Sequence, residues 1–124
     1  MALKRAFRLR KSSEFLRVRQ QGRSFASRLL ILAYVANESE TTRIGFVVSK
    51  RVSKHAVERN YIKRLLSEVV RPLLPNLPGG LDIVLNVRNT AVNADIRTLK
   101  QEVLTLFQRA RLLESGPTTA ETSS

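Results

Sequence analysis

Cationic side chains gather in one stretch of the chain, residues 50–64, which holds six cations and one acid, Glu58. Repulsion among neighbouring like charges is a cost unless an anion neutralises it. Arginine offers planar, forked donors and lysine a compact charge, and both suit phosphate. Asn60 adds an amide that can bond a phosphate, a 2′-hydroxyl or a base edge. These residue types favour a nucleic-acid contact over the alternative, a merely solvated face. The six cations are Lys50, Arg51, Lys54, Arg59, Lys63 and Arg64.

A strand, a basic loop and an amphipathic helix are predicted to position these side chains. The apolar residues Ile44, Phe46 and Val48 alternate up to the first cations, which is typical of a strand. At about 100° per residue from Arg59, the polar and apolar residues fall on opposite halves of a helical wheel. The apolar half contains Tyr61, Ile62, Leu65, Leu66 and Val69.

Composition predicts one basic globular domain of 124 residues, with 43% hydrophobic residues and a net charge of +12. Such a charge attracts polyanions. The chain has no cysteine, so it has neither a disulfide framework nor a thiolate metal site, which fits a reducing cytoplasm. No apolar run approaches the length of a membrane span, so we expect no membrane partner. An Arg-rich transit peptide is disfavoured because the N-terminal residues continue directly into the folded pattern.

The remaining elements predict a two-layer α+β domain, a small mixed sheet with helices in the order α-β-β-α-β-α. The polar link 37–42 has the length of a hairpin loop that would pair the first two strands. Strand 28–36 is apolar on both faces, so both faces must be covered. We expect one domain over residues 1–114 and a disordered tail over 115–124. The other predicted elements are helix 13–21 and strands 43–49 and 81–88, followed by helix 94–113.

Smaller features refine this prediction. Part of the N-terminal segment is expected to dock as an irregular strand through Leu3, Phe7 and Leu9. Ser12 or Ser13 is a candidate N-cap of the first helix. Asn93 or Asp95 is a candidate cap of the last helix, with Phe107 at the edge of its core stripe. That stripe is predicted to be Ile96, Leu99, Val103, Leu106 and Ala110.

Catalytic candidates in the chain are few. A metal nuclease needs several carboxylates that converge on one or two ions, whereas the ten acids here are scattered. Asp82 is the only carboxylate on a predicted strand, with Arg88 as a possible neighbour on the same face. The only histidine, His55, is interpreted as a solvated loop residue rather than a base. The sequence therefore indicates a binding protein rather than a self-sufficient catalyst, and no metal site in the chain.

The segment Ser49-Lys50-Arg51, followed by residues 58–64 (ERNYIKR), resembles the signature of the protein subunit of bacterial ribonuclease P. That pattern is a serine with two basic residues, a short basic loop, and Arg-Asn-Arg-Ile-Lys-Arg on a helix. The resemblance extends over residues 4 to about 113. Tyr61 departs from the pattern, because a second arginine is usual there, so one cationic contact is lost or replaced by stacking.

The resemblance implies an endoribonuclease subunit whose catalytic component is an RNA. That RNA, with Mg²⁺ bound mainly by it, would cut the 5′ leader from precursor tRNA in the bacterial cytoplasm, with no further protein partner required. It also implies a left-handed βαβ crossover, although right-handed crossovers dominate in general. The residues implied to face the catalytic RNA are Lys50, Arg51, Lys54, Arg59, Asn60, Lys63 and Arg64.

A cleft for the single-stranded leader is the second site that the resemblance implies. Its positions in this chain are Phe15, Arg19, Ile31 and Ala33. Arg19 and Ala33 stand where relatives often have aromatic residues, so stacking would rest on Phe15, with help from Arg19. The alternative for Phe15 is a plain core residue.

Two other functions share part of this pattern. A ribosome-associated or RNA-chaperone domain would have the same charge and fold, and it differs in the RNA that co-purifies. A DNA-binding helix-turn-helix regulator needs two helices separated by a short turn. Here the cationic helix follows a strand, which weighs against that class.

Overall fold

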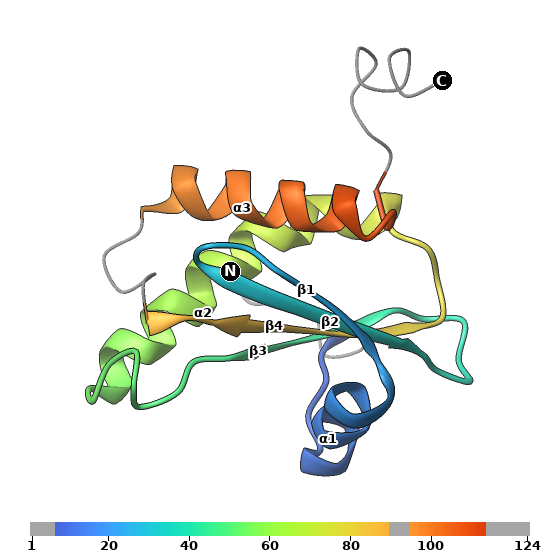
Figure 1. Ribbon diagram of the computed structural model, residues 1–124, viewed down its shortest axis with the longest axis horizontal. Helices are drawn as coiled ribbons and strands as arrows, with labels where there is room; N and C mark the ends of the chain where they lie inside the picture. Colours follow the sequence, from blue (N-terminus) through green and yellow to red (C-terminus); the bar gives the residue numbers. More distant parts are fainter. Residues whose placement is uncertain (1–6, 90–94, 114–124) are drawn as a thin grey trace.

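The computed structural model describes residues 7–89 and 95–113. Their four strands form one mixed sheet. Helices α2 and α3 cover one face of the sheet, and α1 lies against the other (Figure 1). The α+β class is therefore confirmed. No helix within these two ranges is long and apolar enough to cross a membrane. The elements are α1 (Ser12–Gln21), β1 (Arg23–Ala26), β2 (Leu30–Ala36), β3 (Arg43–Val47), α2 (Ala56–Val70), the 3-10 segment η2 (Arg71–Asn76), β4 (Leu81–Val87) and α3 (Ile96–Arg109).

The strand order β1-β2-β4-β3 corrects the predicted hairpin. Strand β2 pairs antiparallel with β1 and β4, and β3 pairs parallel with β4. Thus β4 lies between β2 and β3, and the 37–42 link does not join paired strands. Strand β2 is apolar on both faces and takes an interior position with a partner on each side. Helix α2 connects the parallel strands β3 and β4, so the structure contains the βαβ unit implied by the resemblance.

Strand β1 was not predicted. It has only four residues, three of which are exposed, so it carries no hydrophobic alternation of the kind that marks a strand. It follows α1 after Gly22, and its pairing with β2 completes the sheet on that side.

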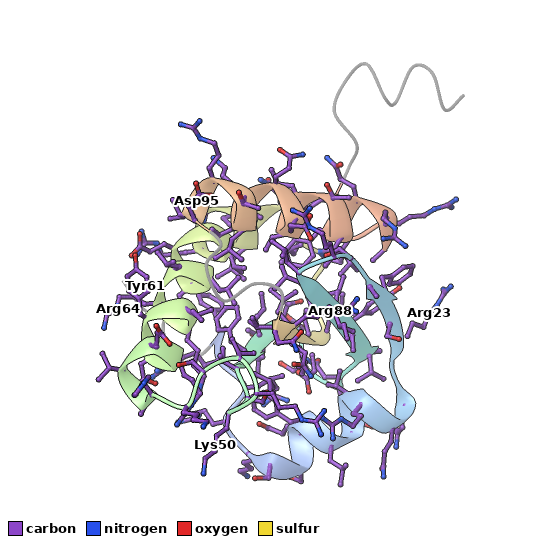
Figure 2. All side chains as sticks on the ribbon, turned by 60° about the vertical axis from the view of Figure 1, so that its left-hand side comes forward. Arg23, Lys50, Tyr61, Arg64, Arg88 and Asp95 are labelled. Carbon is purple, nitrogen blue, oxygen red and sulfur yellow. The ribbon has the colours of Figure 1, made fainter. Side chains whose placement is uncertain are left out.

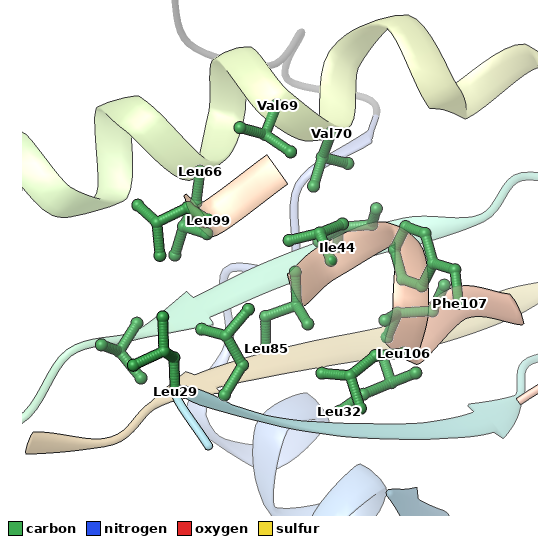
Figure 3. Close-up of a cluster of buried hydrophobic side chains, with 14 of the residues drawn as sticks. Leu29, Leu32, Ile44, Leu66, Val69, Val70, Leu85, Leu99, Leu106 and Phe107 are labelled. Atoms are coloured by element: carbon green, nitrogen blue, oxygen red, sulfur yellow. The ribbon is translucent and has the colours of Figure 1, made fainter. Parts of the chain in front are cut away.

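The main core fills the space between the sheet and the α2–α3 layer (Figure 3). Leu66, Val69 and Val70 of α2 face Ile44 and Leu85 of the sheet. Burying each such side chain contributes roughly 1.5–3 kcal/mol. The buried stripe of α3 differs from the predicted one, because Phe107 is fully buried and Ile96 is exposed. Ile96 occupies the first position of the helix, one turn before Leu99, which is the first buried residue of α3.

A smaller apolar cluster on the opposite face joins Leu9, Val18 and Val84. The backbone N–H of Leu9 donates to the carbonyl of Ile44 at 3.0 Å, and Arg8 forms a parallel bridge with Ile44. The predicted docking of the N-terminal segment is thereby confirmed for these residues, while Leu3 lies outside the described residues.

The helix ends differ in part from the predicted caps. The N-cap of α1 is Lys11 rather than Ser12 or Ser13, and Glu14 accepts from the N–H of Lys11 at 3.0 Å. Asp95 caps α3, because its carboxylate accepts from the N–H of Thr98 at 2.9 Å. The tail for which we predicted disorder, 115–124, and the alternative cap Asn93 lie outside the described residues.

Candidate nucleic-acid interface

The basic loop between β3 and α2 is anchored to the first turns of α2. Ser53 is buried, and its hydroxyl binds Glu58 and accepts from the N–H of His55 at 3.1 Å. Arg59 donates from Nη1 to the Ser53 carbonyl at 3.0 Å. These contacts fix the loop while its cations, Lys50, Arg51 and Lys54, stay exposed to solvent.

The predicted RNA-binding residues of α2 do not all have the same environment. Asn60, Lys63 and Arg64 are exposed, and Arg64 projects outward from α2 (Figure 2). Arg59 is half-buried, and its guanidinium holds the loop. Sequence reasoning took Arg59 as a free surface cation, because a bond to a backbone carbonyl six residues earlier leaves no trace in the residue pattern.

A basic groove of about 510 Å³ runs between the N-terminal segment, α1 and α2. Arg8 and Arg10 contribute from the N-terminal side, and Asn60, Lys63 and Arg64 contribute from α2. Donors therefore approach the groove from two sides, and charged donors of these types form strong hydrogen bonds with phosphate. Ile44, Gly45 and Phe46 of β3 also line it.

A second groove, of about 650 Å³, lies between α1 and the sheet, and we call it the α1 groove. All four predicted leader-binding residues line it: Phe15, Arg19, Ile31 and Ala33. Sequence reasoning missed several other lining residues, among them Leu16, Val47, Val84 and Asn86. Val47, Val84 and Asn86 share one face of β3 and β4, so strand alternation gave a signal once the pairing of the strands was known.

Gly45 makes room for the Phe15 ring against β3. A Cβ atom at this position would lie 2.4 Å from both Cε2 and Cζ of Phe15, and 3.1 Å from Cβ of Leu9. Any side chain there would push the ring out of its place. Phe15 and Arg10 line both grooves, so the α1 groove and the basic groove adjoin at these side chains.

An ionic network fixes α1 to the sheet. Asp82 of β4 is 0% exposed, and Arg43 binds both of its oxygens, at 3.0 and 2.9 Å. Arg17 reaches Asp82 at 3.3 Å and the Ala36 carbonyl at 3.2 Å. Arg43 also donates to Glu14 at 2.8 Å. The network thus joins α1, β2, β3 and β4, and α1 takes part through the side chains of Glu14 and Arg17.

The same contacts shift the ionisation of two members of the network. Hydrogen bonding to Asp82 outweighs burial and raises the pKa of Arg43. Burial opposes ionisation of Glu14, yet N–H donors of Lys11 and Arg10 and the charge of Arg43 outweigh it and lower its pKa. Both groups are therefore held in their charged forms. The predicted neighbour of Asp82, Arg88, instead donates to the Ser27 carbonyl at 2.9 Å.

Carboxylates in the described part of the chain do not converge. No group of three or more His, Cys, Asp or Glu side chains there could hold a metal ion. Glu102 accepts from the N–H of Leu29 at 3.1 Å, Glu58 binds Ser53, and Asp95 caps α3. His55 is exposed at the start of α2. These side chains are thus engaged in separate structural roles.

Fold and site together define a small basic α+β domain in which a cationic helix adjoins an apolar groove. The family model for Ribonuclease P matches residues 3–111. The ribonuclease P protein component of Chloroflexus aurantiacus is 44% identical over 112 residues, covering 90% of this chain and 82% of that protein. The corresponding protein of Caldanaerobacter subterraneus is 38% identical over 107 residues, 86% of this chain and 91% of its own length.

Solved structures of two ribonuclease P proteins have a similar fold. The RNase P protein of Staphylococcus aureus has a TM-score of 0.82 at 26% identity and covers 89% of this chain and 100% of its own. The RNase P protein of Thermotoga maritima has a TM-score of 0.74 at 28% identity, covering 82% and 96%. The chain belongs to the ribonuclease P protein family, the protein components of a tRNA-processing endoribonuclease that also contains RNA.

Proposed function

We propose that this chain binds the catalytic RNA of ribonuclease P and the single-stranded 5′ leader of precursor tRNA, and so assists removal of the leader. The observation that carries the proposal is that the two grooves adjoin at Phe15 and Arg10, which line both. A strand that lies in the α1 groove can therefore pass directly to the cationic surface of α2. The catalytic centre lies in the RNA, which binds most of the Mg²⁺, and the holoenzyme works in the bacterial cytoplasm without a further protein.

The two surfaces have different chemistry and therefore different ligands. The loop and α2 supply charge, which suits the closely spaced phosphates of a folded RNA. The α1 groove supplies an aromatic ring and aliphatic side chains with Arg19 beside them, which suits unpaired bases. We assign Lys50, Arg51, Lys54, Arg59, Asn60, Lys63 and Arg64 to the catalytic RNA, and Phe15, Arg19, Ile31 and Ala33 to the leader.

The identity of the bound RNA tests this proposal directly. The chain is purified from its own cells at low salt, and the RNA that accompanies it is sequenced. One abundant structured non-coding RNA, together with precursor tRNA, is the expected result. Ribosomal RNA as the main species would instead support a ribosome-associated or chaperone role and would refute the proposal.

The first expected outcome concerns the cations of α2. Lys63→Ala combined with Arg64→Ala removes two exposed charges, each worth roughly 1.5 kcal/mol or more if it contacts phosphate. We expect assembly with the catalytic RNA to weaken more than tenfold. The slope of log affinity against log salt should become shallower by about 0.7–0.9 per lost contact. The measurement is a dissociation constant at several salt concentrations.

A matched variant on α3 controls for net charge. Arg97→Ala with Lys100→Ala also removes two exposed cations, but from a helix that lines neither groove. We expect a small change in affinity from this pair. Equal weakening by both double variants would show that only the overall charge of the chain matters.

The second expected outcome concerns the leader. Phe15→Leu keeps apolar bulk but removes the ring, and base–aromatic stacking is worth roughly 1–3 kcal/mol. The holoenzyme should bind precursor tRNA several-fold more weakly, whereas its binding of mature tRNA and its assembly should not change. The measurement is a pair of dissociation constants, with and without the leader. Phe25→Leu, a ring outside both grooves, is the control, and an equal shift of both constants in Phe15→Leu would make Phe15 a core residue.

A further inference from the structure

Two apolar side chains of α2 face solvent on the helix that carries the cations. Val57 is 82% exposed and Tyr61, one turn further on, is 53% exposed. The core-facing side of the same helix is formed by other residues, including the buried Ile62 and Leu66. The Tyr61 ring is therefore not required by the core. Tyr61 projects from the outer side of α2, as Arg64 does (Figure 2).

Tyr61 and Val57 form part of a hollow of about 390 Å³ together with His55, Glu58 and Arg64. Arg64 also lines the basic groove, so the hollow adjoins the surface that we assign to the catalytic RNA. A ligand of the α2 surface therefore meets the Tyr61 ring without leaving that surface.

The chemistry of the hollow favours a nucleobase over a phosphate. Its one acid, Glu58, offsets the charge of its one arginine, so the hollow has no excess of positive charge that would favour a phosphate over a neutral base. Glu58 is fixed by its bond to Ser53, and a fixed carboxylate can accept from the amino or imino group of a base. The tyrosine ring offers a face for stacking, and Arg64 can bind the phosphate next to a stacked base.

We propose that Tyr61 is the stacking platform for one unpaired base of the partner RNA, with Arg64 on the adjacent phosphate. This inference rests on the proposed function and adds a contact of a different kind to the α2 surface. Stacking releases few counterions, so its contribution to affinity does not depend on salt as that of a cation does. The ring thereby supplies affinity that persists at salt concentrations where phosphate contacts weaken.

Salt titration of four variants tests the proposal with the ribonuclease P RNA of the same organism as the probe. Tyr61→Leu should weaken binding roughly five- to tenfold by loss of stacking, at every salt concentration and with an unchanged slope. Tyr61→Phe, which keeps the ring, should bind within about twofold of the unchanged protein. Tyr61→Arg should steepen the slope by about 0.7–0.9, since it adds a phosphate contact. Ile96→Ala, an exposed apolar residue on α3, is the matched control and should have no effect.

Several results would overturn the stacking role. Tyr61→Leu could bind as tightly as the unchanged protein, or Tyr61→Phe could lose as much as Tyr61→Leu, which would indicate a hydroxyl contact. The remaining alternative is that the hollow binds a second copy of this chain. Light scattering of the free protein tests it, because Tyr61→Leu would then abolish self-association. If the unchanged protein does not bind this RNA, the proposed function itself fails, whereas normal binding with silent Tyr61 variants refutes the platform alone.

Discussion

Precursor tRNA incubated with the purified, RNA-free chain and magnesium is expected to stay intact, and the catalytic RNA is expected to restore cleavage. The reason lies in the arrangement of the acids in the described part of the chain, where none converge on a metal site. Asp82 is inaccessible and bonded to Arg43, Arg17 and Asn37. Activation of water by metal ions needs open carboxylate ligands, and Asp82 cannot provide one without breaking this network.

The measurement is the amount of 5′ leader released in a fixed time, with protein alone, RNA alone and both together at low magnesium. Chelation of magnesium should stop the reaction of the complete mixture, because the proposed centre in the RNA depends on the ion. The Lys63→Ala and Arg64→Ala double variant should restore little cleavage at protein concentrations where the unchanged chain is fully assembled. Cleavage by protein verified to be free of RNA would place catalytic groups in this chain and contradict the proposal.

Local patterns predicted α2 and β4, because both elements are long and strongly periodic. The split between charged and apolar halves located α2, and alternation located β4 within one residue. Strand β1 was not predicted, because four residues are too few to show the alternation of a strand. The pairing of the strands was not predicted either. The loop between β2 and β3 has the length of a hairpin loop, and this length does not reveal that β4 lies between the two strands in the sheet.

The candidate site also has a part that was predicted from the sequence and a part that was not. The resemblance placed Phe15, Arg19, Ile31 and Ala33 in one cleft, and these four residues do line one groove. Contacts between distant parts of the chain were not predictable. The partners of Asp82, Arg17 and Arg43, are 65 and 39 residues away in sequence. The role of Gly45 likewise depends on where the Phe15 ring lies, which a local pattern cannot specify.

Asp82→Ala is expected to cause a large loss of stability, because it removes the carboxylate on which the ionic network between α1 and the sheet is built. It leaves the guanidinium groups of Arg43 and Arg17 without their shared carboxylate, and breaking a buried pair costs roughly 3–5 kcal/mol. The two arginine side chains are 29% and 35% exposed, so water compensates in part. We therefore expect the lower end, about 3 kcal/mol, or a fall of roughly 10 °C in Tm.

The substitution should also weaken leader recognition, because Asp82 holds α1 through Arg17 directly and through Arg43 to Glu14. A looser α1 shifts Phe15 and Arg19 relative to the floor of the α1 groove. At a temperature well below its Tm, the variant holoenzyme should lose affinity for precursor tRNA while keeping its affinity for mature tRNA. Assembly with the catalytic RNA should be retained as well, since the loop and α2 are anchored by separate contacts.

The control for Asp82→Ala is Glu38→Ala, which removes an equal charge from an exposed position. Thermal unfolding of both variants separates the network from the net charge of the chain, and the two tRNA dissociation constants separate groove geometry from stability. An unchanged Tm in Asp82→Ala would show that the network does not stabilise the fold. A lower Tm with normal discrimination between precursor and mature tRNA would show that α1 keeps its place without Asp82, and that the groove is fixed by the packing of Val18 and Phe15 against the sheet.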